Sequence, residues 1–196
     1  MEKLAPTEPR FAALTAALAD RRDDLIALTQ DLIRIPTLNP PGENYSEICD
    51  YLDRRLRGAG FQTQLIRAFG TPGDCDAYPR WNVVARREGK YSGDCVHFTS
   101  HIDVVDVGAG WTVDPFGGLL RDGKIYGRGA CDMKGGLAAS VIAVEAFLEV
   151  YPDFAGAIEI SGTADEESGG YGGVAYLAEQ GETASETAGE LVTKGG

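Results

Sequence analysis

A histidine and an aspartate two residues apart follow a stretch whose residue pattern is typical of a β-strand. Residues 96–100 form this stretch, and His101 and Asp103 come at its end. On a strand, side chains two residues apart share a face and lie about 6.6 Å apart along the backbone. This spacing suits an imidazole that binds a metal ion beside a carboxylate that orients the ring. A strand-end histidine and a solvated aspartate are the alternative interpretation.

Asp132 lies in a glycine-rich segment, residues 127–136, directly before a stretch with helical periodicity. Glycine permits backbone geometry that other residues resist, so this carboxylate could be directed into a cleft. An N-cap for the following helix is the alternative role, because helix starts favour aspartate.

Three successive acids, Asp165, Glu166 and Glu167, follow a strand-like segment at residues 158–163. Adjacent carboxylates repel one another, which costs free energy unless a cation or solvent compensates. In a hydrolase, two adjacent glutamates can divide the work, one binding a metal ion and the other handling the proton of an attacking water. An exposed charge run is the alternative interpretation.

The elements that must position these residues alternate between helical and strand patterns. Helices are expected at residues 11–35, 46–58, 136–151 and 172–180. Strands are expected at residues 61–66, 81–86, 94–100 and 157–163, with strand, loop and strand suggesting a hairpin. Residues 101–129 are too irregular for one element and long for a loop without function. This order favours an α/β fold in which helices cover a sheet.

Composition narrows the class of protein. The chain has 196 residues and 43% hydrophobic content, and this length favours a single domain. The formal net charge of -12 opposes a nucleic acid partner, because such binding draws on clustered Lys and Arg. The N-terminus has no apolar signal region and no apolar stretch is long enough to span a membrane, which predicts a cytoplasmic protein. The cysteines form no CxxC pair and are expected to be reduced: Cys49, Cys75, Cys95 and Cys131.

Three motifs, taken in order, resemble those of a known family. HID at 101–103, GRGACDMKGG at 127–136 and DEESGG at 165–170 are similar to motifs of the acetylornithine deacetylase, succinyl-diaminopimelate desuccinylase and carboxypeptidase G family of dizinc peptidases and amidases. The resemblance runs from about Leu25 to Gly181. It implies the N-terminal part of a three-layer helix-sheet-helix catalytic domain of the zinc-peptidase type.

The resemblance also implies a role for each site residue. His101 would bind the first zinc ion, Asp132 would bridge both ions, and Glu167 would bind the second. Glu166 would be the general base, and Asp103 would support His101. The cofactor would be two Zn²⁺ ions, with Co²⁺ or Mn²⁺ as substitutes, and the Asp132–Met133 peptide bond would be cis.

Residues 1–181 are therefore interpreted as a partial metallohydrolase catalytic domain, and residues 182–196 as a divergent tail that is expected to be disordered. The family's lid or dimerisation domain, through which its members form homodimers, has no counterpart in this sequence. Members of the family also have a further carboxylate ligand and a late histidine ligand, and neither has a counterpart that the motifs of this sequence indicate. We therefore expect a truncated form that binds zinc weakly and hydrolyses little or nothing.

The expected reaction is hydrolysis of the amide bond of an N-acyl amino acid, a small-molecule substrate, by zinc-activated water. A non-catalytic metal-binding or interaction protein that retains the partial fold is the alternative. A metalloaminopeptidase of related dizinc architecture is a third reading, which a requirement for a free α-amino group would distinguish.

Overall fold

The structure is a computed structural model in which residues 8–183 are described. The elements along the chain are α1 (Glu8–Asp20), α2 (Arg22–Arg34), α3 (Tyr45–Gly58), β1 (Gln62–Arg67), β2 (Trp81–Glu88), β3 (Tyr91–His101), β4 (Leu119–Arg121), β5 (Lys124–Tyr126), α4 (Lys134–Val150), β6 (Ala155–Thr163), η1 (Glu166–Ser168) and α5 (Val174–Glu179). Of the expected tail, residues 184–196 lie outside the described residues. Between residues 8 and 183, no helix is both long and apolar enough to cross a membrane.

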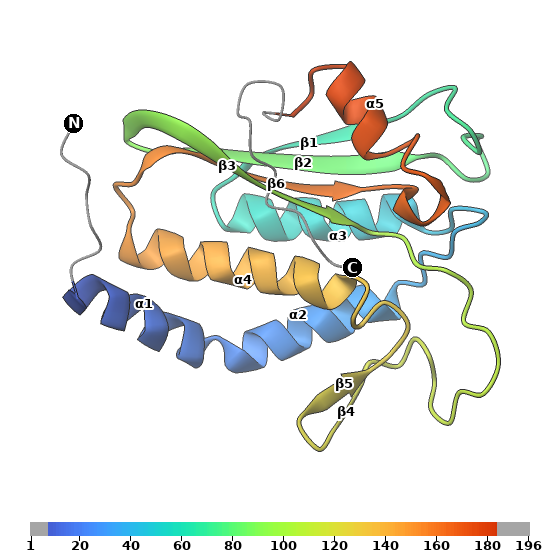
Figure 1. Ribbon diagram of the computed structural model, residues 1–196, viewed down its shortest axis with the longest axis horizontal. Coiled ribbons are helices and arrows are strands. Elements are labelled where there is room, and N and C mark those ends of the chain that lie inside the picture. The colour runs from blue at the N-terminus through green and yellow to red at the C-terminus, as the bar shows by residue number, and fades with distance from the viewer. Residues whose placement is uncertain (1–7, 184–196) are drawn as a thin grey trace.

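The main sheet has the strand order β1-β2-β6-β3 (Figure 1). β1 pairs with β2, and β2 with β6, in antiparallel fashion, whereas β3 and β6 are parallel. β1 and β2 are antiparallel neighbours in the chain and in the sheet, while β6 separates β2 from β3, so the strands expected at 81–86 and 94–100 do not pair with each other. Parallel neighbours need a long crossover connection, and α4 lies within the one that joins β3 to β6.

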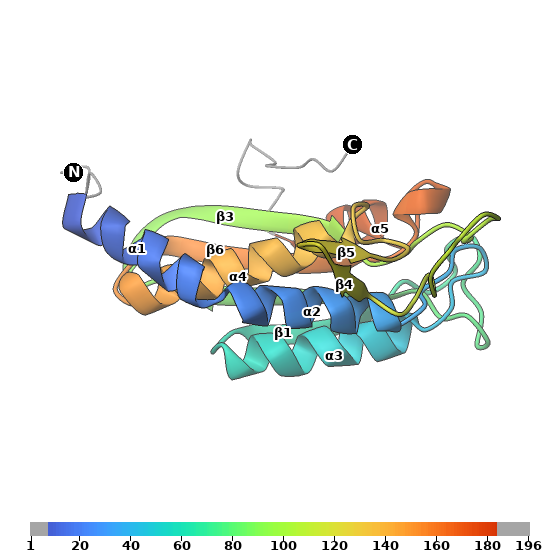
Figure 2. The same cartoon turned by 90° about the horizontal axis from the view of Figure 1, so that it is seen from below.

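Helices cover both faces of this sheet, which confirms the α/β class. Figure 2 shows α1 to α4 on one side, and the main core lies between these helices and the sheet. Alternate residues of a strand point to opposite faces. Val83 and Ala85 of β2 accordingly belong to the main core, whereas Val84 packs with Ile66 and Leu177 beneath α5.

The first expected helix, residues 11–35, is interrupted. Arg21 separates α1 from α2, and its φ of -92° and ψ of 10° fall outside regular α-helical geometry. Its guanidinium group reaches Glu149 at 2.8 Å and Glu145 at 3.5 Å, both on α4. The break lets α1 and α2 both follow α4, as Figure 1 shows, and apolar periodicity continues across it.

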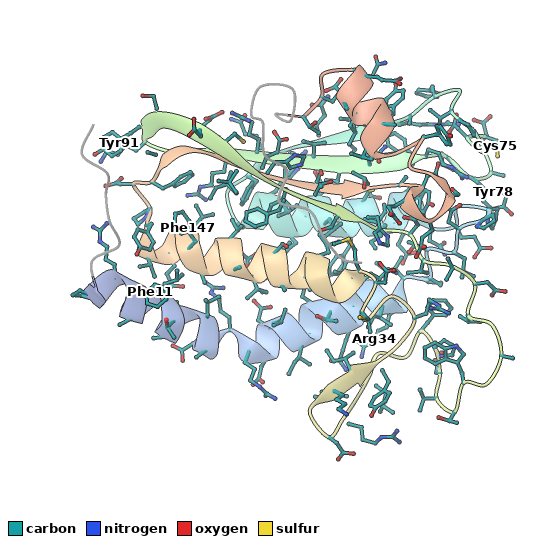
Figure 3. All side chains as sticks on the ribbon, in the orientation of Figure 1. Phe11, Arg34, Cys75, Tyr78, Tyr91 and Phe147 are labelled. Carbon is teal, nitrogen blue, oxygen red and sulfur yellow. The ribbon has the colours of Figure 1, made fainter. Side chains whose placement is uncertain are left out.

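The other helices and strands of the sheet lie close to their predicted positions. The irregular segment 101–129 contains a short hairpin of β4 and β5 that the sequence did not predict. The four cysteines are free thiols, as expected, and Cys75 is exposed in the loop between β1 and β2 (Figure 3).

Candidate metal centre

The candidate site lies where β3 and β6 end. These strands are parallel, and their last residues, His101 and Thr163, are register partners. Because parallel strands end at the same edge of a sheet, the loops that follow them are neighbours. One loop carries Asp103 and the other carries Glu166 and Glu167, while the turn before α4 brings in Asp132 from a third segment.

The structure brings the predicted metal ligands together. His101, Asp132 and Glu167 each offer one ligand atom, and these atoms lie within 4.8 Å of one another. His101 Nε2 is 2.8 Å from Asp132 Oδ1 and 3.9 Å from Glu166 Oε2. His101 is buried, whereas the side chains of Asp132 and Glu166 are exposed. The cluster therefore combines a buried imidazole with the exposed carboxylate of Asp132, and the exposed Glu166 lies beside it.

Asp103 orients the ring of His101. The Nδ1 atom of His101 is 3.0 Å from the backbone carbonyl oxygen of Asp103 and 3.4 Å from its Oδ1 atom. This leaves Nε2 directed towards Asp132. Burial by itself lowers the pKa of His101, but hydrogen bonds to Asp103 and Asp132, with the nearby carboxylate charges, raise it to about 9.

The same aspartate also holds the loop that carries the two glutamates. The carboxylate of Asp103 is fully buried. Its Oδ1 accepts the backbone N–H of Glu166 at 3.2 Å, and its Oδ2 accepts that of Glu167 at 3.1 Å. Asn39 Nδ2 donates a further hydrogen bond to Oδ2 at 2.8 Å. Asp103 thus links the histidine to the acidic loop, which the sequence did not predict.

Two buried polar residues that sequence reasoning missed support this arrangement. Asn39 also donates to Ser168 Oγ at 2.8 Å. Lys134 is fully buried, and its Nζ atom donates to the carbonyl oxygen of Ile35 at 2.6 Å. Burial lowers the pKa of Lys134 to about 7, against the opposing effect of the Asp103 charge. Lys134 lies in the glycine-rich motif at 127–136, whereas Asn39 lies outside all three motifs.

The alternative roles of the acidic residues receive little support from the geometry. Asp132 is not the N-cap of α4, because Met133 occupies that position and no side-chain capping hydrogen bond forms. The Asp132–Met133 peptide bond is cis, as the resemblance implied. The acid run is not uniformly solvated, since Asp165 is buried while Glu166 is exposed. Burial raises the pKa of the half-buried Glu167, although the charge of His101 opposes this rise.

Comparison with known proteins places the chain in a family. Residues 97–194 match peptidase family M20/M25/M40, which is half of the chain. The chain belongs to this family. A succinyl-diaminopimelate desuccinylase from Rhodospirillum centenum is 44% identical over 146 residues, covering 74% of this chain and 36% of that protein. The chain thus spans little more than a third of that relative, and the resemblance inferred from the motifs is confirmed.

Solved structures of M20-type proteins share the fold. Human carnosine dipeptidase 1 matches with a TM-score of 0.74 at 24% identity, covering 86% of this chain and 37% of that one. Bacillus subtilis YXEP, described as a dinuclear metal binding peptidase of the M20 family, matches with a TM-score of 0.55 at 19% identity, covering 86% of this chain and 40% of that one. At these identities the likeness concerns the fold alone.

The donor set of the cluster fits a metal ion. One imidazole nitrogen and two carboxylates converge within 4.8 Å, and the Nε2 atom of His101 faces the carboxylates. Mixed nitrogen and oxygen ligands suit zinc and other divalent transition metals. Metal dependence is a property of the M20 family.

Proposed function

We propose that this chain carries part of a two-zinc site that hydrolyses the amide bond of an N-acyl amino acid. The convergence of His101, Asp132 and Glu167 within 4.8 Å is the observation that carries the proposal. Membership of the M20 family supports it. The 44% identity to a succinyl-diaminopimelate desuccinylase favours an acylated amino acid as the substrate class.

In this proposal the three ligands have different roles. His101 binds one ion through Nε2, and Glu167 binds the other. Asp132, whose Oδ1 atom lies 2.8 Å from His101 Nε2, would be the ligand that the two ions share, as the resemblance implies. When bound, the two ions lower the pKa of coordinated water and polarise the amide carbonyl.

Glu166 is proposed as the general base. Its side chain is exposed, and its Oε2 atom lies 3.9 Å from His101 Nε2. A carboxylate at this position can take a proton from the attacking water and return it to the leaving amine. Asp103 positions this base as well as the proposed ligand, because it holds the backbone of Glu166 and the ring of His101.

The number of ligands sets the expected strength of metal binding. Within residues 8–183, each ion would have Asp132 and one further side-chain ligand. Catalytic zinc usually has three protein ligands. We therefore expect the 196-residue chain by itself to bind zinc weakly and to hydrolyse N-acyl amino acids slowly or not at all.

The test combines zinc titration with turnover, by the purified chain, of N-succinyl and N-acetyl amino acids and of dipeptides with a free α-amino group. Zinc binding should be lost in His101→Ala and Glu167→Ala but kept in His97→Gln, whose ring lies on β3 and contacts Ser161. Equal zinc binding by wild type and His101→Ala would sink the proposal. Zinc binding without turnover would favour the non-catalytic alternative, and cleavage restricted to substrates with a free α-amino group would favour an aminopeptidase.

A further inference from the structure

The first acid of the run, Asp165, takes no part in the ligand cluster. It is buried, and its φ of 62° lies in the left-handed region, directly before Glu166. Its backbone carbonyl accepts the N–H groups of Ser168 at 3.1 Å and Gly170 at 2.6 Å. The turn that presents the two glutamates is therefore built around Asp165.

The carboxylate of Asp165 is held by two buried side chains from distant segments. Arg80 Nε lies 2.9 Å from Asp165 Oδ2, and the two side chains are 4% and 3% exposed. The hydroxyl of Tyr45, from the start of α3, donates to Asp165 Oδ1 at 3.1 Å. A side chain at Gly172 would collide with both Asp165 and Arg80, so the backbone makes room for this pair.

Arg80 itself is fixed by the backbone around it. Its NH1 group donates to the carbonyl oxygens of Pro41 at 2.6 Å and Tyr78 at 3.0 Å. The guanidinium group also lies over the ring of Tyr45, 5.6 Å from its centroid. Tyr78 lies in the loop before β2, at the same end of the molecule as the acidic loop (Figure 3). Arg80 is therefore held in place by its surroundings, and its ion pair with Asp165 fixes the acidic loop to the loop before β2.

A buried ion pair is a weak source of net stability, because both charges lose their hydration. Its position is more informative, since Asp165 adjoins the proposed base and lies two residues before a proposed ligand. We propose that Arg80, Asp165 and Tyr45 form a buried anchor that positions Glu166 and Glu167 for metal binding and proton transfer. These three are positioning residues, and the inference rests on the proposed function for its consequence.

The experiment uses the full 196-residue chain with the variants Tyr45→Phe and Asp165→Asn. Tyr51→Phe is the matched control, because Tyr51 lies on the same helix and donates to Asp31 at 2.9 Å, away from the acidic loop. Amide hydrogen exchange of residues 166–170 is measured without metal, and Zn²⁺ affinity by calorimetry. Urea unfolding of each variant shows that these measurements report on folded protein.

Both anchor variants should speed exchange in residues 166–170 and weaken Zn²⁺ binding about tenfold, the lower end of the effect of losing an outer-shell partner. Tyr51→Phe should match the wild type in both. If Asp165→Asn fails to fold, Tyr45→Phe alone decides. Wild-type exchange and affinity in the folded anchor variants would overturn the inference. Faster exchange in a chain whose wild type binds no Zn²⁺ would support the anchor and refute the proposed function.

Discussion

Zinc binding at this site should compete with a proton on His101. In the metal-free protein, burial opposes protonation of His101, but hydrogen bonds to Asp103 and Asp132 raise its pKa to about 9. A metal ion needs the neutral imidazole. Each pH unit below this pKa therefore costs about tenfold in affinity, and lowering the pH from 8 to 6 should weaken Zn²⁺ binding about 100-fold, or about 2.7 kcal/mol.

Calorimetry measures this effect directly. Titrations at pH 7 in two buffers with different ionisation enthalpies should show that about one proton leaves His101 for each ion it binds. The variant His97→Gln is the control, because His97 lies elsewhere on β3 and contacts Ser161 at 2.8 Å. Its proton release and pH dependence should equal those of the wild type.

One result would refute this reasoning. Affinity that stays constant between pH 6 and 8, in a chain whose zinc binding is lost in His101→Ala, would mean that Asp103 and Asp132 do not keep the ring protonated. The raised pKa of His101 also makes the stability of the metal-free fold depend on pH. Protonated His101 stabilises the metal-free fold fully below its ordinary pKa of 6.5, and this contribution is lost as the pH rises through about 9.

Three further outcomes are expected. Asp103→Asn replaces one of the two carboxylate oxygens by an NH₂ group, so only one of the backbone N–H groups of Glu166 and Glu167 keeps its acceptor. It should lower the free energy of unfolding by about 3 kcal/mol in urea and weaken zinc binding about 10-fold or more. Glu166→Gln should leave zinc affinity unchanged and remove whatever turnover the wild type has, whereas Glu167→Gln should weaken zinc binding; equal affinities in the two would contradict their assigned roles. Leu52→Ala empties a fully buried position and should cost about 2–5 kcal/mol in thermal or urea unfolding, with zinc affinity preserved in the folded protein.

Local patterns were enough to predict most elements of the fold. The helix expected at residues 46–58 corresponds to α3 (Tyr45–Gly58), because its apolar residues recur at helical spacing up to the glycine that ends it. The order of the strands in the sheet was not predictable in this way. β6 inserts between β2 and β3 through pairings between segments far apart in the chain, and residue periodicity carries no information on such partners.

The site likewise has a part that the sequence predicted and a part that it did not. The motifs pointed to His101, Asp132 and Glu167, and the structure places their ligand atoms together. The residues that hold these ligands could not be predicted from the sequence, because Arg80 lies in a loop 85 positions before its partner Asp165. Asp165 itself was indistinguishable from its acidic neighbours in sequence. Only the fold shows that its side chain turns inward while that of Glu166 faces solvent.

The paired register of β3 and β6 makes the site sensitive to changes in chain length. His101 and Thr163 are register partners, so the pairing of β3 with β6 sets the position at which the loop after each strand begins. One residue inserted within β6 would advance Glu166 and Glu167 by about 3.3 Å and exchange the two faces of the strand. Length variation among homologous chains should therefore accumulate at the turn between β4 and β5, around the exposed residues Asp122 and Gly123, and be excluded from β6.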